Sequence, residues 1–194
     1  MWRTDGPMNR RLLYFILVTL LPLAVRAQLV AVGTDVASDV LMIPCVGVEV
    51  VTGNRSSVSL NVSRALKPWW NKDDTKATII QPEYRYYFSG RPISKWFLGV
   101  GGIGAVYDVT WKDKVYDGYA LGGGITFGYV HNLSDRLSID FHSGFGAIYY
   151  RRKEYFVHDN FDTDYTVNGA EQANARGYYL LPTRIGVSVT YILK

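Results

Sequence analysis

Asp140, His142 and Ser143 lie within four residues of one another and supply the three side-chain types of a nucleophilic hydrolase site. In such a site the carboxylate orients the imidazole, and the imidazole takes the proton of the hydroxyl. The residues around them alternate between large apolar and small types, which predicts a β-strand whose neighbouring side chains point to opposite faces. His142 and Ser143 should therefore not meet, and we predict no catalytic residues and no enzyme activity.

Gly99, Gly101 and Gly104 match the G-x-G-x-x-G spacing of a dinucleotide-binding loop. That loop must be followed by a helix, whereas residues 105–110 read as a continuing strand. The three histidines and the single cysteine are scattered and show no metal-ligand spacing. We therefore predict neither a cofactor nor a metal site.

Counting in steps of two along the predicted strands places a set of charged residues on the inward faces. A charge in a narrow interior costs several kcal/mol unless it is paired or hydrated. We therefore predict an internal network in which two arginines bridge the carboxylates and close the lumen. The alternative is a narrow gated path in which the pairs rearrange to admit ions. The seven residues are Asp35, Glu49, Glu83, Arg85, Asp140, His142 and Arg184.

A second group of cations is expected at the outer ends of the predicted strands, where Trp and Tyr residues are interleaved with them. Such side chains can pair with the phosphates of outer-leaflet lipid, which makes lipopolysaccharide a predicted partner. They could equally be ordinary solvated loop charges. The group consists of Lys72, Lys112, Lys114, Arg151, Arg152 and Lys153.

Turn signals divide the chain into eight strands that would position these residues. The longest runs exceed an average soluble strand and carry aromatic residues at their ends, as membrane-spanning strands do. We expect one aromatic group, including Tyr86, Tyr87, Trp96 and Phe97, at the headgroup layer near the shorter turns. The strands are expected at 29–37, 46–52, 57–66, 78–88, 96–107, 118–130, 137–151 and 180–193.

The pattern on the strand faces favours an all-β, closed, antiparallel, eight-stranded transmembrane β-barrel. Gly, Ala and Ser dominate one face, which suits the narrow inside of such a barrel, and large apolar residues dominate the other, which would face lipid. A soluble periplasmic lipocalin-like barrel that binds a small apolar ligand would reverse the faces. That alternative would leave mostly Gly, Ser and Thr outside, with few Lys or Glu, which is poor for solubility.

The connections are expected to be short at one end, at 53–55, 89–95 and 131–136, and longer at the other. This asymmetry is typical of bacterial outer-membrane barrels. The longest connection, loop 156–177, is acidic, and we predict that it contacts a surface protein partner. The barrel itself is expected to be a monomer.

The N-terminal residues predict export. Arg10 and Arg11 precede the apolar stretch 12–23, and Val25-Arg26-Ala27 follows, which indicates a signal peptide cleaved after Ala27. A membrane anchor is the alternative, although the stretch is shorter than the roughly 20 residues of a spanning helix. We thus expect a signal peptide at 1–27 and one barrel domain at 28–194, located in the outer membrane of a Gram-negative bacterium.

The basic character of the chain belongs mainly to that first segment. Residues 1–27 carry four arginines and one aspartate, so removing them lowers the net charge from +4 to +1. A mature chain with so little net charge gives no reason to expect nucleic-acid binding.

Five segments resemble a known family, the small outer-membrane barrel proteins of Bacteroidota grouped as domain of unknown function three-five-seven-five. The resemblance covers most of the chain after the signal peptide, and it implies an outer-membrane barrel without an assigned reaction. The segments are Val46-Gly47-Val48-Glu49, Lys67-Pro68-Trp69-Trp70, Ile80-Gln81-Pro82-Glu83-Tyr84-Arg85-Tyr86-Tyr87, the Gly-rich run 118–129, and Pro182-Thr183-Arg184 with Gly186-Val187.

Overall fold

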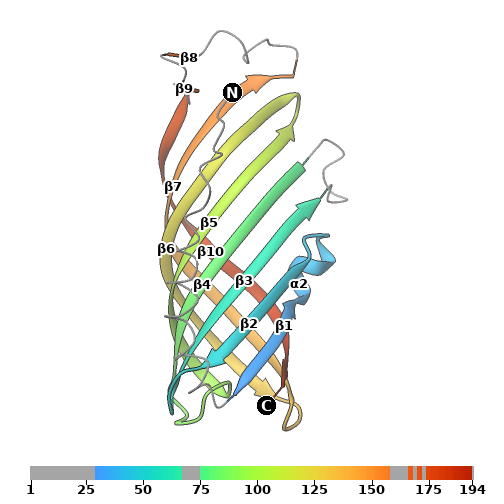
Figure 1. Ribbon diagram of the computed structural model, residues 1–194, viewed down its shortest axis with the longest axis vertical. Coiled ribbons are helices and arrows are strands. Elements are labelled where there is room, and N and C mark those ends of the chain that lie inside the picture. The colour runs from blue at the N-terminus through green and yellow to red at the C-terminus, as the bar shows by residue number, and fades with distance from the viewer. Residues whose placement is uncertain (1–28, 67–74, 158–165, 168–169, 172–173, 194) are drawn as a thin grey trace, which may run out of the picture.

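Eight antiparallel strands are hydrogen-bonded into a closed ring in the computed structural model (Figure 1). The structure describes residues 29–66, 75–157, 166–167, 170–171 and 174–193, so the predicted signal peptide lies outside the described residues. Around the ring the order is β1-β10-β7-β6-β5-β4-β3-β2, in which each strand pairs with its sequence neighbours and β1 closes on β10. The ring strands are β1 (Val30–Asp35), β2 (Cys45–Val51), β3 (Ser56–Leu66), β4 (Thr75–Tyr87), β5 (Lys95–Trp111), β6 (Lys114–Asn132), β7 (Leu137–Phe156) and β10 (Ala175–Ile192).

Three further elements are small. The helix α2 (Val36–Val40) follows β1, and β8 (Thr166–Val167) pairs with β9 (Ala170–Glu171) in a separate two-stranded sheet. In the part of the chain that the structure describes, no helix has both the length and the apolar character needed to cross a membrane.

β5 and β6 are longer than the sequence predicts, and we call the end of the ring to which they extend the tall end. The expected loop between 107 and 118 is a two-residue turn, because β5 and β6 pair without interruption from Lys95↔Val130 to Trp111↔Lys114. Lys112 and Asp113 form this turn with φ angles of 50° and 62°. Two positive φ angles match the twist of a tight hairpin, but they usually require Asn or Gly. Nothing in the Lys-Asp pair therefore signalled the turn.

The first strand is shorter than predicted. It ends at Asp35, whose side chain accepts a hydrogen bond of 3.0 Å from the Ser38 backbone N–H and so caps α2. An aspartate before a helix satisfies backbone N–H groups that have no partner within the helix. The expected strand 29–37 thus gives way to a helix at its outer end.

The two faces of the ring differ as the alternation predicts. Large apolar side chains on the outer face are exposed, for example Ile125 at 59% and Phe145 at 54%. On the inner face of the same strands Thr126, Asp140 and His142 are buried. The apolar residues therefore point outward, and polar residues fill the middle of the interior.

The turns between β2 and β3, between β4 and β5 and between β6 and β7 lie at the end where the C-terminus lies (Figure 1). The two-residue turn between β5 and β6 lies at the other end, so the expected contrast of short and long connections holds only in part. An apolar cluster fills the interior at the end with the C-terminus. Tyr87 and Phe97 belong to it, fully buried, with ring centroids 5.5 Å apart. The prediction that Tyr87 and Phe97 lie at the headgroup layer near these turns is therefore wrong, because both side chains face the interior of the ring. The reason is strand parity: Tyr87 lies two residues after the inward Arg85, whereas its neighbour Tyr86 faces out. The cluster consists of Ala31, Val51, Tyr87, Ile93, Phe97, Val130 and Ile192.

Candidate functional site

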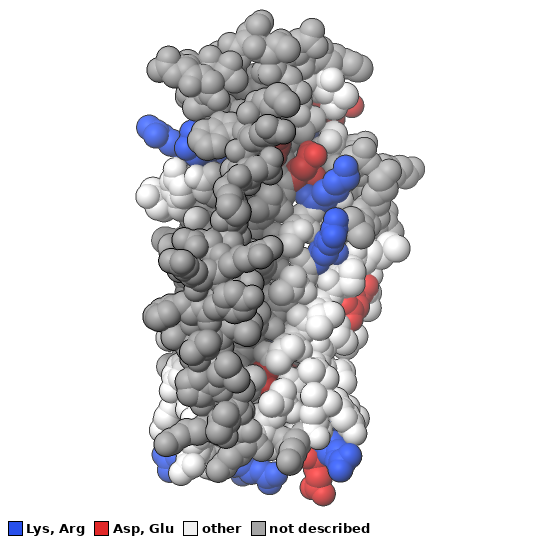
Figure 2. Space-filling view, in the orientation of Figure 1, with Lys and Arg blue, Asp and Glu red and all other residues white. Residues whose placement is uncertain are grey.

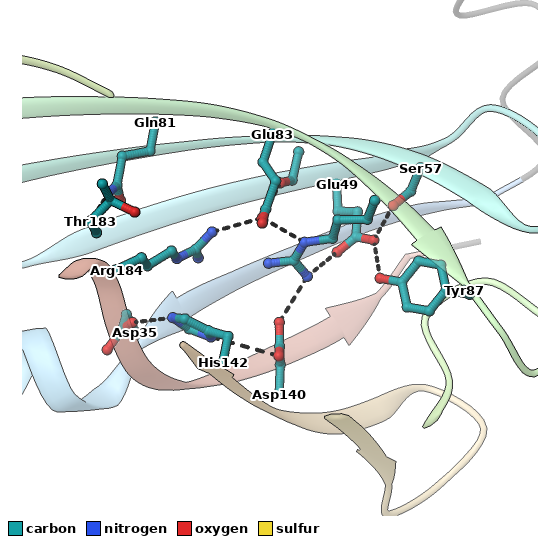
Figure 3. Close-up of polar contacts among 12 residues, drawn as sticks. Asp35, Glu49, Ser57, Gln81, Glu83, Tyr87, Asp140, His142, Thr183 and Arg184 are labelled. Carbon is teal, nitrogen blue, oxygen red and sulfur yellow. Dashed lines mark hydrogen bonds and ion pairs between the residues drawn. The ribbon is translucent and has the colours of Figure 1, made fainter. Parts of the chain in front are cut away.

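Arg85 lies at the centre of a buried polar network inside the ring. Figure 3 shows this network, with its carboxylates, Tyr87, His142 and Arg184 labelled. Arg85 Nε is 2.7 Å from Glu83 Oε2, and Arg85 Nη1 is 2.8 Å from Asp140 Oδ2 and 3.2 Å from Glu49 Oε2. The guanidinium carbon also lies 4.5 Å from the centre of the Phe97 ring, a cation–π contact with the apolar cluster. One cation from β4 thus holds carboxylates from β2, β4 and β7.

The carboxylates have further partners. The Tyr87 hydroxyl donates to Glu49 Oε1 at 2.6 Å, and the Ser57 hydroxyl donates to the same oxygen. Arg184 of β10 provides the second guanidinium, and its Nη1 lies 3.0 Å from Glu83 Oε2. Ser57 and Tyr87 were absent from the predicted network, although both share the inward parity of their strands.

His142 lies between two carboxylates. Its Nε2 is 3.2 Å from Asp35 Oδ2, and its Nδ1 is 3.6 Å from Asp140 Oδ1. Asp35 also caps α2, so the network reaches the outer end of β1. Ser143 is exposed on the opposite face of β7, so Asp140, His142 and Ser143 do not form a hydrolase triad.

The structure therefore brings all seven predicted residues together, from β1, β2, β4, β7 and β10. Four of them are carboxylates and only two are guanidiniums, so the network holds more acid than base even when His142 carries a proton. Two cavities lined by network residues measure about 20 Å³ each. Such a cavity holds about one water molecule.

Glycines make room for these side chains. A Cβ at Gly99 would collide with the Glu83 carboxylate, and one at Gly186 would collide with that of Asp35. At Gly101 a Cβ would lie 2.7 Å from the Pro82 carbonyl oxygen. Two glycines of the dinucleotide-like spacing thus serve close packing inside the ring, on a strand with no helix after it.

The predicted lipid-contacting cations divide into two groups. Lys114 and Arg152 turn toward Glu154, with Nζ–Oε2 and Nη2–Oε1 distances of 2.6 Å each. Arg152 also lies over the Tyr116 and Tyr150 rings, at 4.9 and 4.7 Å from their centres. These two cations already have a carboxylate partner at the tall end of the ring.

The other cations lie differently. Lys112 and Arg151 are exposed, Lys153 is half-buried, and Lys72 lies outside the described residues. On the face shown in Figure 2, Lys and Arg side chains lie in the upper half and at the lower end, and the described wall between them shows only isolated Asp or Glu side chains. Lys112 and Arg151 remain the most accessible members of the predicted group.

The Lys114–Glu154 contact gives a pH-dependent prediction. The hydrogen bond from Lys114 lowers the pKa of the Glu154 carboxyl below its usual 4.5. A lowered folded-state pKa contributes stability above the usual pKa and loses it as the pH falls through the folded value. We expect Glu154→Gln to melt at a lower temperature than the wild type at pH 7. The difference should shrink as the pH falls below 4.5 and vanish only below the lowered folded-state pKa. A difference that stays constant from pH 7 into this acidic range in thermal scans would contradict the prediction.

The comparisons with known proteins give one result. Residues 13–193 match the family described as "Protein of unknown function (DUF3575)". The chain belongs to this family. The match confirms the resemblance seen in the sequence, and its description assigns no reaction or partner. Neither the curated proteins nor the solved structures contain a match to the chain.

Proposed function

We propose that this DUF3575 member is an exported outer-membrane barrel of a Gram-negative bacterium, with a closed lumen and a structural or surface-interaction role. The distribution of polarity carries the proposal: apolar side chains cover the outside, and ion pairs fill the inside. This arrangement suits a wall surrounded by lipid, because lipid accepts apolar side chains and the pairing of all eight strands in a ring satisfies backbone N–H and C=O groups within the wall. The predicted signal peptide at 1–27 would deliver the chain.

The interior supports a plug more than a gated pore. Arg85 makes three carboxylate contacts at once, so opening a path requires several buried pairs to separate together. Separating a buried pair leaves charges without compensation at a cost of about 3–5 kcal/mol. The apolar cluster around Tyr87 and Phe97 also closes the interior, at the end of the ring opposite the tall end.

The soluble lipocalin-like alternative receives less support. It requires apolar side chains inside and polar ones outside, whereas Val46, Val100, Leu121 and Ile125 are all more than half exposed. A soluble monomer rarely exposes such a continuous apolar surface.

Mobility on a denaturing gel tests the proposal. We expect the protein in the outer-membrane fraction, with a faster-migrating band in unheated samples that shifts after boiling, because a closed barrel resists detergent until it is heated. Recovery in the soluble periplasm without a shift would overturn the membrane location. The variant Arg85→Met, which removes the central cation, should reduce the unheated band and so serves as a control for folding.

The tall end is the proposed surface-interaction region. In Figure 1, β5, β6 and β7 rise beyond the ends of β2, β3 and β4. Loop 156–177 joins this region, and its acidic residues Asp159, Asp162 and Asp164 lie outside the described residues. We propose that this loop provides the contact with a surface protein partner, because it connects β7 with β10 and long loops on a sheet scaffold often carry binding contacts.

Lipopolysaccharide contact is proposed for the exposed cations only. We expect Lys112→Gln with Arg151→Gln to lower the melting temperature in lipopolysaccharide-containing vesicles more than in neutral detergent, since only the former offers phosphates. Arg152→Gln is the matched control, because its guanidinium already pairs with Glu154 and should matter equally in both media. Equal losses for the double variant in both media would contradict the contact.

A further inference from the structure

The ring closes over only part of its height between β1 and β10. The two strands pair from Ala31↔Ile192 to Asp35↔Ser188, whereas β10 begins thirteen residues earlier, at Ala175. At Asp35 the chain leaves the ring and forms α2, which packs against β10. Within the described residues, the upper part of β10 is therefore paired with β7 but not with β1.

The stretch of β10 that pairs with β7 but not with β1 is irregular. Pro182 has no N–H to donate, and the register with β7 shifts between Pro182 and Arg184. The carbonyl of Thr183 is satisfied across the interior by Gln81 Nε2 at 3.0 Å. A proline and a bulge both oppose pairing with an added strand, so this edge is unsuited to a protein strand as its partner.

A cavity of about 280 Å³ lies at this position, between α2 and β10. Its lining includes Pro182 and Ile185, which are exposed on the outer face, and Ile79 and Ile103, which lie on inner faces. Because inner-face and outer-face residues line the same cavity, it passes through the wall. Its size is close to the lower limit of about 300 Å³ for small-molecule sites.

The lining combines apolar walls with a polar end. Isoleucines 43, 79, 103 and 185 provide the walls, and Gln81 and Thr183 provide hydrogen-bonding groups. Asp35 and Arg184 are the charged residues of the lining, and they already pair with His142 and Glu83. The lining thus carries one charge of each sign, and both charges are already paired, so neither an anionic nor a cationic group would gain a free partner here. The cavity therefore favours an uncharged polar group.

We propose that this cavity binds a single-chain amphiphile with an uncharged, hydrogen-bonding head, of the monoacylglycerol type. The head lies beside Gln81 and Thr183, and the alkyl chain passes Ile185 and Pro182 into the surrounding lipid. The proposal rests on the membrane location proposed above, because only lipid outside the wall would supply and accept the chain.

Cys45 provides a built-in reporter for the test. It lines the cavity, is buried, and is the only cysteine in the chain. Proteoliposomes of the full chain would be treated with N-dodecylmaleimide, whose uncharged ring and alkyl chain match the proposed ligand, and separately with a sulfonated maleimide. We expect the alkyl reagent to modify Cys45 about tenfold faster than the sulfonated one, since burying two methylene groups gives a gain of this size. Monoolein should slow the reaction of the alkyl reagent.

Matched variants separate a filled cavity from a general effect on the barrel. Ile103→Trp places a bulky side chain in the cavity and should slow the alkyl reaction at Cys45 about tenfold. Val106→Trp, on the same strand but 66% exposed on the outer face, should leave the rate unchanged. Equal effects of the two variants would overturn the proposed site.

A second reporter distinguishes failure of the site from failure of the membrane location. In a Cys45→Ser background, Val100→Cys places a thiol on the outer wall, where Val100 is 60% exposed. The membrane location stands if the alkyl reagent modifies Val100→Cys and the sulfonated reagent does not. With that result, the cavity proposal is wrong if Cys45 resists the alkyl reagent or if the sulfonated reagent modifies Cys45 as fast as the alkyl reagent does. If the sulfonated reagent modifies Val100→Cys freely, the wall faces water and both proposals fail.

Discussion

Arg85→Met is expected to lower the free energy of unfolding by ~3–5 kcal/mol, the cost of removing one partner from a buried ion pair. The methionine fills a similar volume but leaves Glu49, Glu83 and Asp140 without their shared cation. The loss should lie at the upper end of that range, because three carboxylates lose a contact and only Glu83 keeps a second guanidinium. Urea unfolding of the refolded barrel in detergent measures the change.

Two further variants show that the loss comes from buried charge. Arg151→Met removes an exposed arginine from the outer face and should change the stability little. Arg85→Met combined with Asp140→Asn should recover part of the loss, because one of the abandoned charges is then neutral. A loss below ~1 kcal/mol for Arg85→Met, the value typical of exposed pairs, would mean that water already solvates the network and that the lumen is open.

Ile125→Arg is expected to destabilise the barrel by ~2–4 kcal/mol in a lipid bilayer, the cost of an arginine on the lipid face near the midplane. Ile125 is 59% exposed on the outer face and pairs with Val100 and Phe145, which are exposed on the neighbouring strands. A charge here has apolar neighbours on both sides and lies far from either strand end. Unfolding in vesicles, with the wild type as reference, measures the effect.

The same experiment decides between a wall that faces lipid and one that faces water. Leu133→Arg lies in the turn between β6 and β7, where Leu133 is 54% exposed, and should stay within about 0.5 kcal/mol of the wild type. If Ile125→Arg were as harmless as Leu133→Arg, the outer face would already be in water, and the soluble barrel would become the better interpretation.

The sequence-based predictions were wrong at both ends of the ring, for different reasons. At the tall end, Lys112 and Asp113 adopt positive φ angles, which these residue types rarely do. The sequence therefore predicted a longer loop where the structure has a tight hairpin turn. At the end opposite the tall end, Tyr87 and Phe97 were expected on the outer face with the other aromatic residues. Each lies two residues along its strand from an inward-facing residue, Arg85 or Gly99, and therefore faces the interior. The aromatic residue type wrongly predicted an outward position for both side chains, whereas the two-residue alternation correctly predicts an inward one.

By itself, the sequence determined the eight strands of the ring without their exact bounds, the two faces of each strand, and the charged members of the polar network. Successive side chains of a strand alternate between two faces, so Glu83, Arg85 and Asp140 could each be assigned to the inside from local pattern alone. The tertiary structure decided which carboxylates Arg85 contacts, that Asp35 both caps α2 and meets His142, and that β1 leaves β10 partly unpaired. These features depend on pairing register between distant strands and on closure of the ring, and no local pattern carries that information.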